Sequence, residues 1–255
     1  MTLTDAHCHL QDPAFAGELN IILERAKAFG IRRFGVNGTC PADWPAVAKL
    51  AKMHPEVLPQ FGVHPWKVEN LPENWLEELK GYLLRFPQAG LGEIGLDRKL
   101  TDTAMSLQVD IFSQQVKLAC EYNRACTFHI IKAWEEFWSV LNVHAPKQFL
   151  MHSFRGSAEQ VSAFKAYGAY FSFGGALLRH PNSKKMASAL RAVPKDRLLL
   201  ETDAPYQHPQ GLKVRQEPAG LLVIAEKVAE IRGEELPLLL REIEKNSQEF
   251  FQTGK

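Results

Sequence analysis

Residues 3–9, LTDAHCH, decide between the two folds open to this sequence. The run is rich in β-forming residues and ends in His-Cys-His. The first strand of an open doubly wound sheet would lead into a glycine-rich turn that holds a phosphate on a helix N-terminus. Because the histidines stand in place of that turn, the sequence disfavours the open sheet.

Short β-rich runs recur along the rest of the chain, and helical patterns separate them. The further β-rich runs cover 33–39, 58–64, 90–96, 125–130, 148–153, 169–174 and 197–203. Apolar residues at i, i+3, i+4 spacing mark amphipathic stretches at 17–30, 43–54, 73–86, 106–122 and 157–168. The alternation is typical of parallel strands joined by crossover helices. Eight repeats in 255 residues predict an α/β protein that is a single (β/α)8 TIM barrel.

No linker, composition shift, low-complexity tract or repeat interrupts this pattern. We therefore expect one domain over residues 1–255. A pair of helices at 218–232 and 236–251 is expected to complete the outer ring of the barrel.

The composition is that of a globular protein, with 45% apolar and 23% charged residues. The net charge of +1 gives no global positive field to attract nucleic acid or an anionic membrane, so an anionic substrate must be held locally. Four cysteines without a C-x-x-C pair argue against a disulfide framework and a cysteine zinc site. With neither a signal peptide nor an apolar run of about 18 residues, we expect a cytoplasmic protein outside the membrane.

The polar residues of the first run lie on one face of the predicted strand. Side chains alternate along a strand, so Asp5, His7 and His9 share a face. Two imidazoles at this spacing suit chelation of one divalent ion, although two surface or hydrogen-bonded histidines would give the same pattern.

Four more polar residues stand near the carboxyl ends of otherwise apolar strands: Glu93, His129, His152 and Asp203. In a parallel barrel all of these ends meet at one face. Each buried carboxylate without a partner would cost roughly several kcal/mol of folding free energy, and a bound divalent cation offsets that cost. The sequence therefore favours a metal site over six unrelated capping or salt-bridged residues.

The motifs in their order resemble the TatD-type deoxyribonucleases of the metal-dependent hydrolase superfamily. They are D-A-H-C-H-L at 5–10, G-V-H-P at 62–65, G-E-I-G-L-D at 92–97, a histidine at 129, H-S-F-x-G-S at 152–157 and E-T-D-A-P-Y at 201–206. The resemblance covers nearly the whole chain.

The resemblance implies a two-metal centre for phosphodiester hydrolysis. One ion would be held by His7, His9 and Asp203 and the other by His129 and His152. Glu93 would bridge the two. Two such ions stabilise the attacking and leaving oxygens of an in-line displacement and supply hydroxide at neutral pH. Asp203 either orients or deprotonates the attacking water, or serves as a ligand only.

Three neighbouring residues have two interpretations each. His64 either contacts a phosphate oxygen or the leaving group, as the resemblance suggests, or is structural. Glu201 has the strand parity of Asp203 and either hydrogen-bonds a metal ligand or fills a polar position in the core. Asp97 either touches the site or caps the next helix.

The chain departs from the family pattern at Ile131, where H-x-R-x-A would place an arginine. Arg155 is the replacement phosphate contact that we favour, with Arg98 or Lys99 on another loop as further candidates. Lys132 is adjacent to Ile131, but it leaves the strand on the other face and lacks the fork of arginine.

Two other features have a structural and a functional interpretation each. The basic run 179–197 either steers a nucleic-acid backbone or is the solvated face of a helix. Trp66 and Trp134 either stack on an unpaired base or pack under a loop.

We therefore expect a hydrolase that uses two divalent ions, whether zinc, magnesium or manganese, to cleave DNA. The resemblance suggests a 3′-5′ exonuclease acting on single-stranded DNA. The catalytic residues would be Asp203, Glu93 and His64. Hydrolysis of an amide, cyclic imide or ester is the alternative within the superfamily, and a metal-binding barrel without catalysis is the third hypothesis. Oligomeric state is left open.

Overall fold

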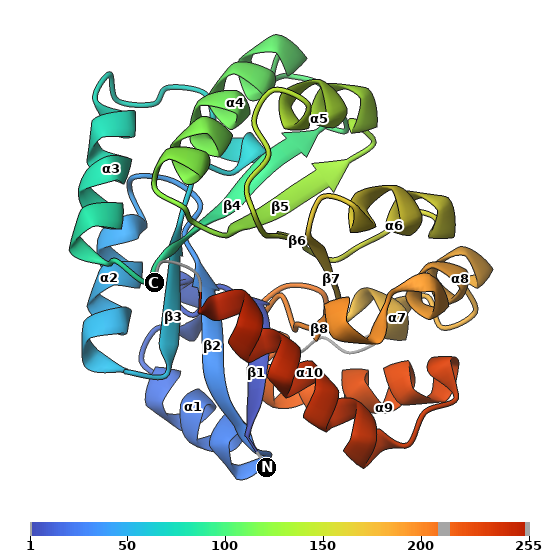
Figure 1. Cartoon of the computed structure of the whole chain (residues 1–255). Helices are drawn as coiled ribbons and strands as arrows, with labels where there is room; N and C mark the ends of the chain where they lie inside the picture. Colours follow the sequence, from blue (N-terminus) through green and yellow to red (C-terminus); the bar gives the residue numbers. More distant parts are fainter. Residues whose placement is uncertain (1, 209–214, 253–255) are drawn as a thin grey trace. The chain divides into compact units, whose positions relative to one another are not determined.

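Eight parallel strands alternate with helices in the computed structural model, which describes residues 2–208 and 215–252 (Figure 1). The strand order follows the sequence from β1 to β8. The strands are β1 (Leu3–Cys8), β2 (Ile31–Asn37), β3 (Val57–Phe61), β4 (Gly90–Asp97), β5 (Cys126–Ile131), β6 (Phe149–Met151), β7 (Ala169–Phe173) and β8 (Leu198–Leu200). Each predicted run thus overlaps a strand.

The helices lie between the strands and after the last of them. They are α1 (Leu19–Ala28), α2 (Trp44–Met53), α3 (Trp75–Arg85), α4 (Met105–Glu121), α5 (Trp134–Leu141), α6 (Ala158–Lys165), α7 (Ala176–Arg179), α8 (Lys184–Ala192), α9 (Leu221–Arg232) and α10 (Leu236–Phe251). The predicted carboxy-terminal pair is present as α9 and α10. A 3-10 turn over Pro218–Gly220 takes the start of the first predicted helix.

Several strands end before the predicted boundary because the backbone turns there. β8 stops at Leu200, and Asp203 has a φ of 57°, in the left-handed region that an extended strand does not allow. Ser153, after β6, has a φ of 44°. His152 and Asp203 therefore lie in the loops after β6 and β8, whereas Glu93 and His129 lie within β4 and β5.

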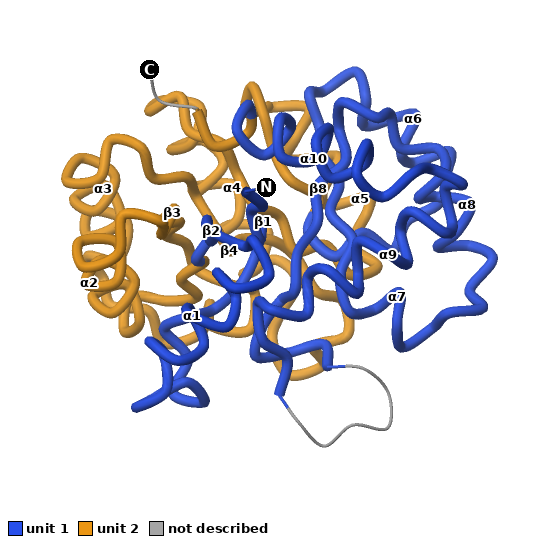
Figure 2. Tube along the Cα trace, turned by 90° about the horizontal axis from the view of Figure 1, so that it is seen from below, with its two compact units in different colours: residues 1–36, 152–249 blue, residues 37–151, 250–255 orange. Residues whose placement is uncertain are grey.

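The chain divides into two compact units, residues 1–36 with 152–249 and residues 37–151 with 250–255 (Figure 2). In the first unit, β1 pairs with β2 and β7 pairs with β8. The first and last strands of the sheet are also neighbours there, because the Asp203 N–H donates to the His7 carbonyl (2.9 Å). In the second unit β3, β4, β5 and β6 pair in that order. One domain over residues 1–255 stays a prediction.

Each unit buries its own apolar interior. In the second, Phe112 of α4 packs on Phe128 of β5 with ring centroids 5.3 Å apart, and Phe137 of α5 joins them. In the first, Phe154 packs edge-on against Phe171 of β7 at 5.0 Å. These contacts fix the strands from which the polar residues project.

The basic run 179–197 contains α8, and its Lys184 and Lys185 are exposed on that helix. Exposed lysines of this kind agree with both interpretations of the run. Within residues 2–208 and 215–252, no helix combines the length and the apolar character needed to cross a bilayer. All four cysteines are free, as expected.

Candidate metal centre

In the first unit, four residues at the carboxyl ends of strands form what we call the β8 cluster: His7, His9, His152 and Asp203. The Oδ1 atom of Asp203 lies 3.5 Å from Nε2 of His7 and 3.5 Å from Nε2 of His9. The rings of His7 and His152 stack with centroids 3.9 Å apart. Ligand atoms of His7, His152 and Asp203 all lie within 4.8 Å of one another.

The junction of β1 and β8 holds this cluster in place. Asp5, fully buried on β1, accepts a hydrogen bond at Oδ1 from the backbone N–H of Thr202 (2.9 Å) and one at Oδ2 from the Thr202 hydroxyl. Burial raises the pKa of Asp5 to about 7, although the hydrogen bonds from Thr202 oppose the shift. The segment that carries Asp203 is thereby fixed against the strand that carries His7.

Glu201 lies behind the cluster and touches one of its histidines. Its Oε1 is 3.0 Å from Nδ1 of His152, and its Oε2 accepts a hydrogen bond from the Ser172 hydroxyl. Glu201 and Ser172 are both fully buried. The contact favours the interpretation of Glu201 as a partner of a metal ligand. With Nδ1 facing the carboxylate, Nε2 is the nitrogen of His152 that would bind a metal.

Gln207 joins three loops around Asp203. Its amide Nε2 donates to Oδ2 of Asp203 (2.6 Å) and to the hydroxyl of Ser153 (2.9 Å). Its Oε1 accepts a hydrogen bond from the backbone N–H of Ala176 (3.0 Å). One buried amide thus links the loops that follow β6, β7 and β8, and it leaves Oδ1 of Asp203 to face the histidines.

The charges of the β8 cluster favour an ionised carboxylate. Burial by itself raises the pKa of Asp203, but contacts with His7 and His9 and the charge of His152 outweigh burial and hold the pKa well below its usual range. Asp203 therefore carries a negative charge at neutral pH, as a metal ligand must.

In the second unit, four residues form what we call the β4 cluster: His64, Glu93, Asp97 and His129. Oε1 of Glu93 lies 2.9 Å from Nδ1 of His129 and 3.3 Å from Nε2 of His64. Oδ2 of Asp97 lies 3.4 Å from Nε2 of His129. Ligand atoms of His64, Glu93 and His129 lie within 4.8 Å of one another.

Both ring nitrogens of His129 face carboxylates, and this sets its charge when no metal is bound. Burial alone lowers the pKa of His129, but contacts with Asp97 and Glu93 prevail and raise it to about 9. Burial likewise raises the pKa of Asp97, and the contacts with His129 and Trp66 outweigh it and lower the value to about 2. A divalent cation would replace the positive charge of this imidazolium.

Two buried glutamines of α4 hold the backbone beside the β4 cluster. Gln108 accepts from the N–H of Asp97 (2.8 Å) and donates to its carbonyl (3.2 Å). Gln115 does the same for Val63, at 2.7 Å and 3.1 Å. Asp97 also accepts from the N–H of Lys99 (2.9 Å) in the turn after β4. Its contact with His129 agrees with the interpretation that it touches the site. The helix-capping interpretation is wrong, because α4 begins at Met105 with Ala104 as N-cap and without a side-chain capping bond.

The predicted substrate contacts have different surroundings. Arg155 is exposed on the loop after β6. The pKa of Arg179 is lowered, mainly by burial and also by the charge of Arg155. Arg98 donates to the carbonyl of Lys132 (3.0 Å) and forms an ion pair with Glu136, so its guanidinium already has protein partners.

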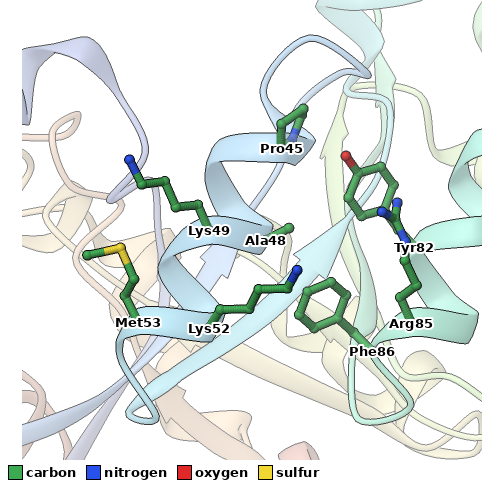
Figure 3. Close-up of a pocket in the computed structure, with 8 residues that line it drawn as sticks. All are labelled: Pro45, Ala48, Lys49, Lys52, Met53, Tyr82, Arg85 and Phe86. Atoms are coloured by element: carbon green, nitrogen blue, oxygen red, sulfur yellow. The ribbon is translucent and has the colours of Figure 1, made fainter.

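A hollow of about 390 Å³ lies apart from these residues, between α2 and α3 (Figure 3). Its lining residues are Pro45, Ala48, Lys49, Lys52, Met53, Tyr82, Arg85 and Phe86. Because it is lined by neither histidine nor carboxylate, it offers none of the metal ligands of the clusters.

The donors of both clusters fit a divalent metal. Imidazole nitrogen and carboxylate oxygen suit zinc, and the same oxygens suit magnesium and manganese. Each cluster offers two histidines and a carboxylate within 4.8 Å. The supporting residues Gln207, Thr202 and Gln108 were not found from the sequence. In a sequence, a single amide or hydroxyl side chain that is not part of a periodic pattern does not indicate which residue it will bond.

Comparison with known proteins accounts for this arrangement. The family model described as TatD related DNase matches residues 4–252. The chain belongs to the TatD family. A metal-dependent hydrolase from Bacillus subtilis, YabD, whose function is uncharacterised, is 30% identical over 239 residues, 90% of this chain and 91% of YabD. The 3′-5′ ssDNA/RNA exonuclease TatD of Pantoea ananatis is 29% identical, over 97% of this chain and 98% of that protein.

A TatD homologue of known structure shares the fold. The crystal structure of YjjV from Escherichia coli K12 matches with a TM-score of 0.91 and 27% identity, over 98% of each chain. Together with the eight alternating parallel strands, this confirms the predicted (β/α)8 barrel. The resemblance stated from the motifs is also confirmed, and the chain is a metal-dependent hydrolase of the TatD family.

Proposed function

We propose that this hydrolase is a nuclease that removes nucleotides from the 3′ end of single-stranded DNA. The observation that carries the proposal is the pair of clusters at the carboxyl ends of the strands, each with two imidazoles and a carboxylate within 4.8 Å. The name of the Pantoea relative supports the substrate and the polarity.

His7, His9, His152 and Asp203 would hold metal in the first unit, and Glu93 and His129 in the second. Bound divalent ions would lower the pKa of a coordinated water and stabilise charge on the phosphate oxygens. Two ions, with Glu93 as the bridging ligand, are part of the proposal. The metal is zinc, magnesium or manganese.

The residues of the chain have distinct tasks in this reaction. Because its pKa is well below the usual range, Asp203 is a poor proton acceptor, which favours ligation and orientation of the water over proton abstraction. In neutral His64, Nδ1 accepts the Trp66 backbone N–H (3.1 Å), so the ring proton is on Nε2. That N–H faces Oε1 of Glu93 (3.3 Å), and in the reaction a phosphate oxygen or the leaving group would take the place of this carboxylate as its acceptor. Arg155 would bind phosphate in place of the arginine that Ile131 replaces, and contacts by Arg98 and Lys132 belong to the same proposal.

The test uses single-stranded DNA labelled at either end, the same sequence as duplex DNA and as RNA, and a panel of amides and cyclic imides. Each substrate is incubated with chelator and after return of zinc, magnesium or manganese. We expect chelator-sensitive release of mononucleotides from the 3′ end of the single strand, and loss of release in Asp203→Asn. Turnover of amides alone would instead support the alternative hydrolase. Retained metal with no turnover would support a non-catalytic barrel.

Elemental analysis of the purified protein identifies the metal and its stoichiometry. Two equivalents per chain are expected, and one equivalent at saturation would contradict the two-metal arrangement. A cytoplasmic location, favoured by the four free cysteines, is proposed with the function.

A further inference from the structure

Trp66 is the exposed tryptophan beside the β4 cluster. It lies in the 3-10 turn Pro65–Lys67 that follows His64, and 62% of its surface is open to solvent. Trp44 and Trp75, on α2 and α3, are buried to 0% and 7% exposure. Of the two sequence interpretations for Trp66, packing under a loop therefore does not describe this side chain.

The exposed indole is nevertheless held in a fixed orientation. Its Nε1–H donates to Oδ2 of Asp97 (2.9 Å). Its ring stands edge-on to His64, with centroids 5.1 Å apart, and edge-on to His129 at 6.2 Å. The Trp66 backbone N–H donates to Nδ1 of His64 (3.1 Å). These contacts hold the indole on one side, while 62% of the residue stays open to solvent.

The surroundings of Trp66 suit a polyanion with planar groups. Lys67, the next residue, and Lys99, whose backbone N–H bonds to Asp97, are both exposed. Neither ammonium is in an ion pair with another residue of the part of the chain that the structure describes. Exposed lysines on the same loops as a fixed aromatic side chain are the elements by which proteins bind single-stranded nucleic acid.

We propose that Trp66 is a stacking platform for an unpaired base of the substrate, next to the β4 cluster. The inference rests on the proposed nuclease function and refines it. A base inside a duplex is already stacked on both faces and cannot cover the indole. Stacking on Trp66 therefore selects single strands, and it holds the nucleotide near His64 and His129.

The test compares Trp66→Ala and Trp66→Phe with wild type in chelator, so that binding is measured without cleavage. The probe is a fluorescent single-stranded oligonucleotide, either with all its bases or with abasic residues over its last three positions at the 3′ end. Trp138→Ala, on α5, is the control for loss of an indole elsewhere in the same unit. Unchanged melting temperatures of the Trp66 variants show that they fold.

For the oligonucleotide with bases, we expect Kd to rise about tenfold in Trp66→Ala and much less in Trp66→Phe. For the abasic probe, wild type and Trp66→Ala should bind equally, and Trp138→Ala should match wild type on both. An equal loss on both probes, or no loss on either, overturns the platform.

Cleavage assays separate this inference from the proposed function. If cleavage in restored metal is unchanged in Trp66→Ala and binding is also unchanged, the platform is refuted while the nuclease stands. If base-dependent binding requires Trp66 but no DNA is cut, the platform stands and the nuclease is refuted. If wild type binds neither probe in chelator, the platform is refuted, and cleavage after return of metal decides the nuclease separately.

Discussion

Replacing Gln207 with leucine tests whether the amide at the junction of three loops positions Asp203. Leucine fills similar space but removes the hydrogen bonds to Asp203 (2.6 Å), Ser153 (2.9 Å) and the Ala176 N–H (3.0 Å). A hydrogen bond to a buried charged group contributes about 1.5–3 kcal/mol and a neutral one about 1 kcal/mol. Since Ser153 is half-buried and water can reach its hydroxyl, Asp203 and Ala176 dominate. The free energy of unfolding should fall by about 3 kcal/mol in metal-free protein.

The second readout is metal affinity. Loss of a group that orients a metal ligand typically weakens binding about 10- to 100-fold, and we expect Gln207→Leu to fall in that range. Denaturant unfolding in chelator measures the stability, and calorimetric titration with metal measures the affinity. A Gln207→Leu protein that binds metal as wild type does would refute the positioning role, whatever its stability.

Asn246→Leu is the matched control. The Asn246 amide donates to the carbonyls of Lys195 (2.7 Å) and Leu198 (3.0 Å) in the same unit, at the amino-terminal end of β8. Its loss should lower stability by about 2 kcal/mol while metal affinity is unchanged. If both variants weakened metal binding equally, the loss of affinity would come from general destabilisation and not from the position of Asp203.

Three further predictions concern single residues of the site. Glu201→Gln keeps the shape of the side chain but removes the charge beside His152, so metal affinity should fall about tenfold. The control is Glu244→Gln. Glu244 is a buried glutamate that accepts a hydrogen bond from the Thr4 hydroxyl, and its replacement should leave metal affinity unchanged. In metal-free protein the His129 pKa is raised from 6.5 to about 9, so its stabilising contribution is complete below about pH 6.5 and is lost as the pH rises through about 9. Melting temperatures in chelator from pH 6 to 10 should show this decline, and a decline of the same size in His129→Gln would contradict it. Arg155→Ala should raise KM for single-stranded DNA about tenfold with little change in kcat, and unchanged kinetics would exclude Arg155 as the phosphate contact.

The sequence by itself determined the order of strands and helices and most of the chemically active residues. Alternation of β-rich runs with helical spacing is a local pattern, so it can be read without tertiary contacts. The same holds for the histidines and carboxylates next to apolar runs, because parallel strands must bring their carboxyl ends to one face. For this reason the sequence distinguishes His7, Glu93 and Asp203 from the other polar residues as candidates for the site.

The tertiary structure decided what surrounds those residues. β8 ends at Leu200 and Asp203 has a left-handed backbone, and the strand pattern in LLLETDAP shows neither. The hydrogen bonds of Gln207 and the exposure of Trp66 depend on residues distant in sequence, Ser153 and Asp97 among them. Periodicity reports which face of an element is apolar, whereas the partner of a single polar side chain is fixed only when loops distant in sequence come together.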